Sequence, residues 1–204
     1  MMRTSKTLLK KLPEIVADEI RKQHEHGMAI RLMFQDEACF GRINKTRRCW
    51  APEKIRPDTL HQVVREYTYV YAAVSPHDGV MDSLVLPETN SEAMSLFLRE
   101  VSGRHNDELI LMVLDGAGWH RAKDLAVPEN MRLIFLPPYS PQLNPVEHIW
   151  DEIREKWFTN KAFRDLDSVQ ELLVKALVTL ENDHNLVQNT AGFNWIVSIN
   201  LNAT

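Results

Sequence analysis

The stretch ELILMVLD, residues 108–115, is a continuous apolar run that ends in an aspartate. Such a run is typical of a central strand that is covered on both faces of a sheet. A helical pattern with a Ser at its start and a Gly at its end occupies residues 91–103, and a second apolar segment, MRLIFLP, follows at 131–137. A strand reached through a helical crossover lies parallel to its neighbour, so this half of the chain predicts parallel strands.

The segments before residue 91 predict antiparallel strands joined by short links. They are 29–38, 46–51, 67–75 and, after a PHDG turn, 80–87. In the third segment, YTYVYAAVS, β-branched and aromatic residues favour a strand. In the first, AIRLMFQDEA, a period of two places Asp36 on the same face as Phe34. The chain is therefore predicted to form an α/β domain with a mixed sheet and helices on its faces.

Helical patterns are found at both ends of the chain. Near the N-terminus the apolar residues have helical spacing, and a helix is expected to begin at about Pro13. A later helix begins near Pro145, and an amphipathic one covers residues 167–181. We expect a helical arm over residues 1–27 and a single domain over residues 28–204.

Bulk properties exclude several classes of protein. The 204 residues are 44% hydrophobic and 25% charged, as in soluble globular proteins, and no apolar run is long enough to span a membrane. No signal peptide is recognisable and two cysteines are too few for a disulfide scaffold, so a cytoplasmic location is expected. A nucleotide-binding P-loop or Rossmann site is disfavoured because no Gly-rich loop follows the first strand, and zinc would need clustered Cys and His.

The charge of the chain is negative overall but uneven. A net charge of −4 argues against a surface-wide nucleic-acid binder. Residues 42–56, RINKTRRCWAPEKIR, nevertheless contain six basic residues and one acid. Such a strip can hold a phosphate backbone; alternatively, it is a solvated hairpin edge whose charges prevent strand pairing.

Two of the predicted strands end in aspartate, at Asp36 and Asp115. In open α/β sheets ligands bind outside the carboxyl ends of strands, so the two carboxylates converge if their strands are neighbours. Two desolvated carboxylates repel each other unless one is protonated or a cation lies between them. Sites rich in carboxylate oxygen suit Mg²⁺ or Mn²⁺.

Glu147 is a third candidate for this carboxylate site. In NPVE, Asn144 stands at the N-cap and Glu147 three residues later, which is the form of a capping box. The preceding loop, PPYSPQLNP, holds prolines that fix the backbone and would place the start of the helix accurately. Glu147 is therefore interpreted as a helix cap, as a site carboxylate, or as both.

Read together, FQDEACFGR, LDGAGWH and LPPYSPQLNPVEHIW resemble the catalytic domain of mariner-related bacterial insertion-sequence transposases. Members of this DDE superfamily carry three carboxylates on a ribonuclease-H-like fold, with three antiparallel strands followed by two parallel ones. The resemblance implies that Asp36, Asp115 and Glu147 are the catalytic residues and bind two divalent metal ions, Mg²⁺ or Mn²⁺. It further implies metal-dependent cleavage of DNA at transposon ends and strand transfer into target DNA.

The implied partner is double-stranded DNA, bound by a homodimer and located with the nucleoid of a bacterial cell. Relatives carry an N-terminal helix-turn-helix module, whereas here at most one helix precedes the first strand, so we expect that module on a separate or fused segment. Candidates for contacts with DNA are Arg42, Lys45, Arg47, Arg48, His120, Tyr139 and Ser140. His120 is equally interpreted as a structural histidine, and Tyr139 and Ser140 as residues that hydrogen-bond the proline loop.

Two other functions are left open by the sequence. A catalytically inactive ribonuclease-H-like module for DNA binding or assembly, from a truncated element, would keep the fold without cleaving DNA. A two-carboxylate hydrolase acting on sugars would need no metal, but the strand-end aspartates and the proline loop do not favour it.

Overall fold

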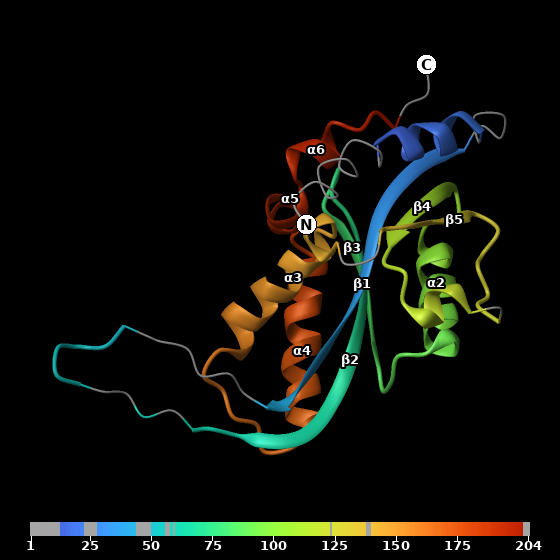
Figure 1. Ribbon diagram of the computed structural model, residues 1–204. Coiled ribbons are helices and arrows are strands. Elements are labelled where there is room, and N and C mark those ends of the chain that lie inside the picture. The colour runs from blue at the N-terminus through green and yellow to red at the C-terminus, as the bar shows by residue number, and fades with distance from the viewer. Residues whose placement is uncertain are drawn as a thin grey trace.

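The computed structural model describes residues 13–22, 28–43, 50–55, 58, 60–122, 124–137 and 140–201. A sheet of order β3-β2-β1-β4-β5 separates two layers of helices (Figure 1). Its strands are β1 (Ala29–Ile43), β2 (Val63–Ser75), β3 (Val80–Leu86), β4 (Glu108–Leu114) and β5 (Met131–Phe135). The first three strands are antiparallel to one another, and β4 and β5 run parallel to β1. The predicted mixed five-stranded sheet is confirmed.

Helices cover both faces of the sheet. Helix α2 (Ser91–Arg104) lies on one face (Figure 1). On the other face lie α3 (Val146–Ile153), α4 (Leu166–Glu181), α5 (His184–Ala191) and α6 (Asn194–Val197). A helix over residues 13–22 buries Val16 and Ile20 in the same core as these C-terminal helices. Among the described residues no helix is long and apolar enough to cross a membrane.

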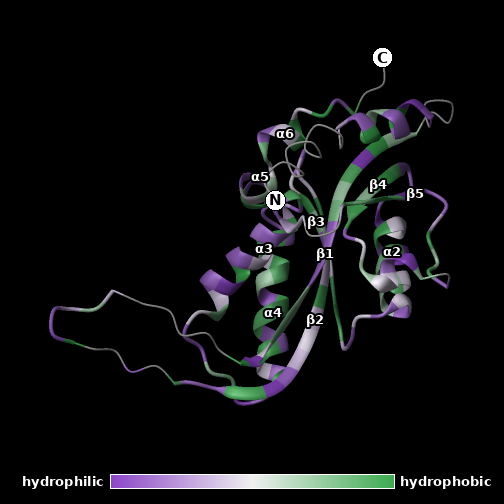
Figure 2. Cartoon of the chain, viewed as in Figure 1, coloured by the Kyte–Doolittle hydropathy of each residue, from purple (hydrophilic) through white to green (hydrophobic). Residues whose placement is uncertain are grey.

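The alternation of side chains along the strands divides the core in two. On β1, Leu32 and Phe34 belong to the cluster under the C-terminal helices, while Met33 packs with α2. On β4, Leu111 and Met112 are fully buried on opposite faces, which explains why that strand is apolar throughout. Figure 2 shows this hydrophobic character along the strands and on α4.

Several predicted boundaries differ from the structure. Most of the strand expected over 46–51 lies outside the described residues; of its residues only 50 and 51 are described, and these are not in a strand. The third antiparallel strand of the sheet is β3, in the segment expected over 80–87. It follows the tight turn that ends at Gly79, where φ is +73° and an added Cβ would lie 1.9 Å from the carbonyl oxygen of His184.

Strands β1 and β2 are longer than the expected 29–38 and 67–75, and the other differences are at helix ends. Helix α2 is capped by Asn90 rather than Ser91, because the Asn90 side chain accepts a hydrogen bond from the backbone N–H of Ala93 at 2.8 Å. The helix also passes through Gly103 and ends at Arg104. Helices α5 and α6 were not predicted; both are short and bury few residues.

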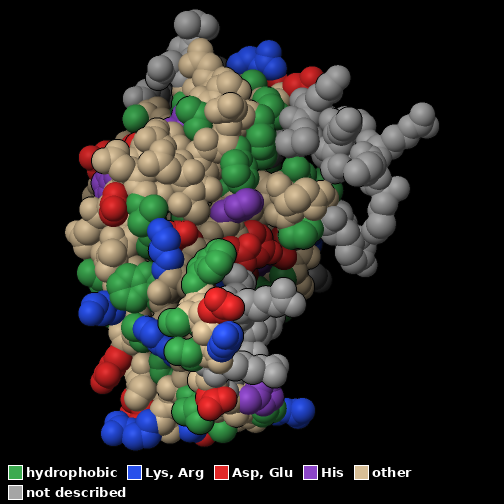
Figure 3. All heavy atoms as spheres, turned by 90° about the vertical axis from the view of Figure 1, so that its left-hand side faces the viewer, with side chains coloured by type: hydrophobic (Ala, Val, Ile, Leu, Met, Phe, Trp, Pro, Cys, Tyr) green, Lys and Arg blue, Asp and Glu red, His purple; other side chains and the backbone are tan. Residues whose placement is uncertain are grey.

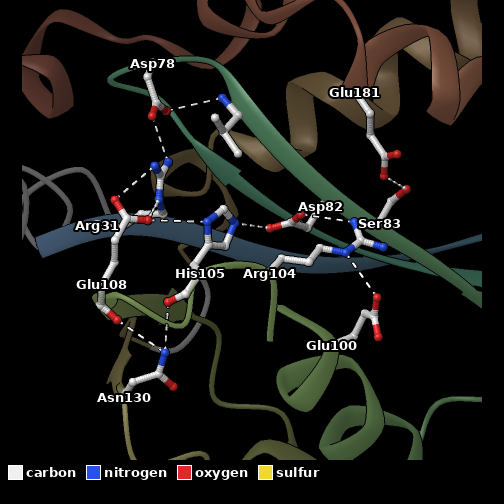
Figure 4. A network of polar contacts seen from close by, with 11 residues as sticks. Arg31, Asp78, Asp82, Ser83, Glu100, Arg104, His105, Glu108, Asn130 and Glu181 are labelled. Atoms are coloured by element: carbon white, nitrogen blue, oxygen red, sulfur yellow. Dashed lines mark hydrogen bonds and ion pairs between the residues drawn. The ribbon is translucent and has the colours of Figure 1, made fainter. Parts of the chain in front are cut away.

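A polar network ties the end of α2 to the sheet (Figure 4). Asp82 of β3, with a side chain 7% exposed, lies 3.1 Å from Arg104 and 2.7 Å from His105. His105 also lies 3.3 Å from Glu108 at the start of β4, and Glu108 pairs with Arg31 of β1. The network therefore links four elements at the end of the sheet where β1 and β4 begin.

Asp82→Ala is expected to lower the free energy of unfolding by about 3 kcal/mol, because it leaves the Arg104 guanidinium and the His105 ring without their buried partner. Glu100→Ala, which removes an exposed partner of the same Arg104, is expected to change it by less than about 1 kcal/mol. Urea denaturation of both variants measures the difference. If the two variants lose equal free energy of unfolding, the buried Asp82 does not contribute more to stability than the exposed Glu100.

Candidate active site

The pairing of β1 with β4 brings two aspartates to one edge of the sheet. In the parallel ladder Phe34 is the partner of Val113, and two residues further along each segment lie Asp36 and Asp115. Neighbouring residues of parallel strands project to the same side. Because β4 ends at Leu114 while β1 continues, Asp115 lies where the chain leaves the sheet beside Asp36.

Asp36 is held by the helix that follows the proline loop. The indole Nε1 of Trp150 in α3 donates a hydrogen bond to Asp36 Oδ2 at 2.9 Å, and Trp150 itself is 1% exposed. Burial, followed by the charge of Glu147, raises the pKa of Asp36 from 3.8 to about 7, against the lowering effect of the Trp150 hydrogen bond. The Asp36 and Glu147 carboxylates therefore lie close enough to repel each other.

Asn144 positions the start of α3 against β1. Its Nδ2 donates to the backbone carbonyl of Gln35 at 2.8 Å, and its Oδ1 accepts from the backbone N–H of Val146 at 3.2 Å. The capping box suggested by the sequence is not formed. In such a box the Glu147 side chain would accept from the backbone N–H of Asn144, but that N–H donates to the carbonyl of Pro141. Asn144 thus fixes the first turn of α3 beside the residue that precedes Asp36.

Asn144→Ala is expected to lower the free energy of unfolding by about 2 kcal/mol, since it leaves the buried Gln35 carbonyl without its donor. Asn144→Asp should lose most of the same energy, because a carboxylate still accepts from Val146 but cannot donate to Gln35. Asn182→Ala, at the exposed end of α4, is the matched control and should change stability by less than about 1 kcal/mol. Chemical denaturation measures both losses. Equal losses of free energy of unfolding for Asn144→Ala and Asn182→Ala would contradict the role of Asn144 in fixing α3 against β1.

Asp115 is held by a histidine that bridges two strands. His120 is 2% exposed; its Nδ1 lies 2.9 Å from Asp115 Oδ1 and its Nε2 lies 2.8 Å from Glu37 Oε1. Trp119 Nε1 donates to the same Glu37 oxygen at 3.2 Å. Burial lowers the pKa of His120, but the hydrogen bond and charge of Glu37, together with Asp115, outweigh it and raise the pKa above 6.5. Glu37, on the opposite face of β1 from Asp36, therefore anchors the turn that carries Asp115.

Comparison with known proteins places this arrangement in a family. Residues 31–170 match the family described as DDE superfamily endonuclease. The chain belongs to this family. This DDE endonuclease domain is also 44% identical, over 105 residues, to the uncharacterized protein y4pE/y4sA of Sinorhizobium fredii (strain NBRC 101917 / NGR234), a match covering 50% of this chain and 77% of that protein.

Solved structures with the same fold include those of Mos1 transposase. The catalytic domain of Mos1 mariner transposase has a TM-score of 0.53 at 13% identity, covering 94% of this chain and 93% of that one. The Mos1 mariner paired end complex with Mn has a TM-score of 0.59 at 14% identity, covering 90% of this chain but 60% of that one. The DDE endonuclease domain thus spans about three-fifths of the Mos1 chain in that complex, and the predicted family and fold are confirmed.

The carboxylates of this DDE endonuclease domain fit a divalent metal. Among the described residues no three His, Cys, Asp or Glu side chains are gathered so as to hold a metal ion. The donor set is nevertheless one of hard oxygen ligands, and a cation would favour the ionised form of Asp36, which burial and the Glu147 charge disfavour by raising its pKa. Asp115, whose side chain is 57% exposed, would have to turn from His120 to join Asp36.

The residues predicted to contact DNA differ in how far their side chains are engaged within the fold. The Arg42 guanidinium is occupied by structural contacts, since it donates to the carbonyls of Phe163 and Arg164 and pairs with Glu66 at 2.7 Å. His120 is buried against Glu37 and Asp115, and Ser140 lies just before the 3₁₀ turn Pro141–Leu143. Outside the described residues lie Lys45, Arg47, Arg48 and Tyr139. Contacts of all these residues with DNA stay predictions.

Figure 3 shows acidic side chains gathered near the middle of one face, with a His side chain close by.

The sequence did not identify Trp150 as a partner of Asp36, or Asn144 as the link to β1. A signal was present for Trp150, which stands three residues after Glu147 and therefore on the same side of the helix.

Proposed function

We propose that this chain is the catalytic domain of a transposase that cleaves DNA at transposon ends and transfers the freed 3′ hydroxyl into target DNA. The observation that carries the proposal is the position of Asp36, beside Asp115 in the strand register and against Glu147, in a member of an endonuclease family. Structures of similar fold support it, because they include Mos1 transposase in a paired-end complex with the left transposon end.

Two of the three carboxylates of the proposed site, Asp36 and Asp115, each have a separate support within the chain. Asp36 and Asp115 would hold two Mg²⁺ or Mn²⁺ ions, and Glu147 would complete the site. When bound, such ions activate the attacking oxygen and stabilise the leaving oxygen of an in-line displacement at phosphorus. Trp150 holds one oxygen of Asp36, while His120 holds Asp115 until a cation competes for it. Mos1 mariner complexes with Mn and with Mg support the choice of metal.

The proposed partners are double-stranded DNA and a second copy of the chain. The described residues 50–55 lie well away from the sheet (Figure 1), and they expose Trp50 fully and Ile55 at 60%. Large apolar side chains held in solvent in this way favour burial against another molecule. We propose a homodimer on DNA, with recognition of the ends by a helix-turn-helix module on a separate or fused segment, acting in the bacterial cytoplasm at the nucleoid.

Nicking of supercoiled plasmid by the purified protein tests the proposed function. Wild-type protein is expected to nick in Mn²⁺ and to be inactive in chelator, because the carboxylates alone cannot activate water at phosphorus. Fusing a DNA-binding arm to the chain should increase the rate without changing the requirement for metal. Binding of DNA or Mn²⁺ with no nicking by either form would favour the alternative of an inactive DNA-binding or assembly module.

A further inference from the structure

The proposed active site poses an electrostatic problem for binding DNA. Four carboxylates, those of Asp36, Glu37, Asp115 and Glu147, lie at one edge of the sheet, and the chain carries a net charge of −4. A DNA strand adds a phosphate charge for about every 3.4 Å of helix rise. Bound metal ions offset charge at the scissile phosphate, but the flanking phosphates need cations from the protein. Figure 3 shows basic side chains beside and below the acidic group.

Arg121 flanks the site on the side of Asp115. It ends the 3₁₀ turn Gly118–Arg121, directly after His120. Its guanidinium carbon lies 4.7 Å from the ring centroid of Phe135, and its Nη2 would lie 3.1 Å from a Cβ added at Gly116, the residue after Asp115. Among the residues that the structure describes, no carboxylate pairs with Arg121. Its side chain is thus held by stacking at the carboxyl end of β4, with its N–H groups unused by acids.

Arg154 flanks the site on the side of Glu147. It follows α3 seven residues after Glu147, two turns along the same side of the helix. Its guanidinium carbon lies 5.4 Å from the ring centroid of Phe40, which shares a strand face with Asp36. The ion pair of Arg154 with Asp151 is long, 3.9 Å, and both side chains are exposed. Arg154 also lines a groove of about 480 Å³ beside Cys39 and Tyr67, at the far end of β1.

We propose that Arg121 and Arg154 bind DNA backbone phosphates on the two sides of the catalytic carboxylates; this inference rests on the proposed function. An aromatic ring beneath a guanidinium fixes its plane and leaves its edge free for bidentate bonds to phosphate. Seven helical residues separate Glu147 from Arg154 by about 10 Å, which corresponds to roughly three nucleotides of duplex rise. Arg154 would therefore contact a phosphate about three nucleotides from the one at Glu147.

Three other arginines of the described residues, Arg31, Arg42 and Arg104, are engaged by partners within the fold. Arg31 pairs with Asp78 and Glu108, and Arg104 pairs with Asp82. Their guanidinium groups serve the fold, as does that of Arg42. Arg99, exposed on α2 on the other face of the sheet, is a suitable control because its removal changes the charge by the same amount.

Fluorescence anisotropy of a labelled DNA duplex, titrated with protein in Ca²⁺ at several salt concentrations, tests the inference. Arg121→Ala and Arg154→Ala are each expected to weaken binding roughly 5- to 10-fold and to reduce the slope of log K against log salt by about 1. Arg99→Ala should change affinity by less than about twofold. The Arg→Lys variants, which keep charge and fold but lose the planar fork, should keep the slope and lose part of the affinity.

The outcomes separate this inference from the proposed function. Variants of Arg121 and Arg154 that bind like Arg99→Ala, with an unchanged salt slope, would overturn it even if the wild type nicks plasmid. A wild-type protein that fails to bind the duplex at low salt would also overturn it. If the wild type binds and the two variants lose affinity and slope, but no protein nicks DNA in Mn²⁺, then the inference stands and the catalytic proposal fails.

Discussion

Glu147→Gln is expected to abolish Mn²⁺-dependent strand cleavage without destabilising the fold. The loss of rate should exceed about 100-fold, because even the outer partners of metal ligands account for 10- to 100-fold. The free energy of unfolding should stay equal or rise, since the Glu147 charge acts on the buried Asp36 and its removal relieves repulsion. A helix cap would behave in the opposite way, losing about 1 kcal/mol of stability and keeping its activity.

Plasmid nicking and urea denaturation of the same preparation separate the two roles of Glu147. Asp151→Asn, an exposed carboxylate one turn further along α3, is the matched control and should keep both activity and stability. A Glu147→Gln protein that nicks at the wild-type rate would remove Glu147 from the site.

Asp36→Asn is expected to stabilise the metal-free protein above pH 7. The folded pKa of Asp36, about 7, lies above its ordinary value of 3.8, so between these values the folded state keeps a proton that the unfolded chain has released. The stability of the wild type should therefore fall as pH rises through this window. At roughly 1.4 kcal/mol for each pKa unit, the loss is at most about 4 kcal/mol. The Asn side chain has no such proton and still accepts from Trp150.

Saturating Mn²⁺ should reverse this order. A metal that binds the folded state alone stabilises it by mass action, and the wild type can bind while Asp36→Asn cannot bind well. Denaturation of both proteins at pH 5 and pH 8, each with and without Mn²⁺, measures the effect. Parallel pH profiles in the absence of metal would show that Asp36 does not carry an unfavourable buried charge.

Much of the fold follows from local sequence patterns. The apolar run that ends at Asp115 predicted a strand buried on both faces, and the alternation before Asp36 placed that carboxylate on a defined face of β1. Once the two strands are neighbours, their register places Asp36 and Asp115 each two residues beyond the paired Phe34 and Val113. The hairpin after Ser75, closed by Gly79, supplies the third antiparallel strand in the segment expected over 80–87, while most of the strand expected over 46–51 lies outside the described residues.

The supports of the site could not be predicted in the same way, because they depend on contacts between distant segments. Asn144 and the carbonyl of Gln35 are 109 positions apart, and Trp150 and Asp36 are 114 apart. A helical pattern predicts that Trp150 is buried, but not that its indole N–H meets a carboxylate. Likewise NPVE has the form of a capping box in sequence, and the packing of α3 on β1 turns Asn144 toward the strand instead.

The position of Mn²⁺ in an anomalous difference map, from crystals of the wild-type protein soaked in manganese, tests the central claim most directly. The account predicts manganese bound by Asp36, Asp115 and Glu147, with the Asp115 carboxylate turned away from His120 and Trp150 still bonded to Asp36. A map with no manganese at these three carboxylates, or with Asp115 still paired to His120 in protein that nicks DNA in the same metal, would contradict it.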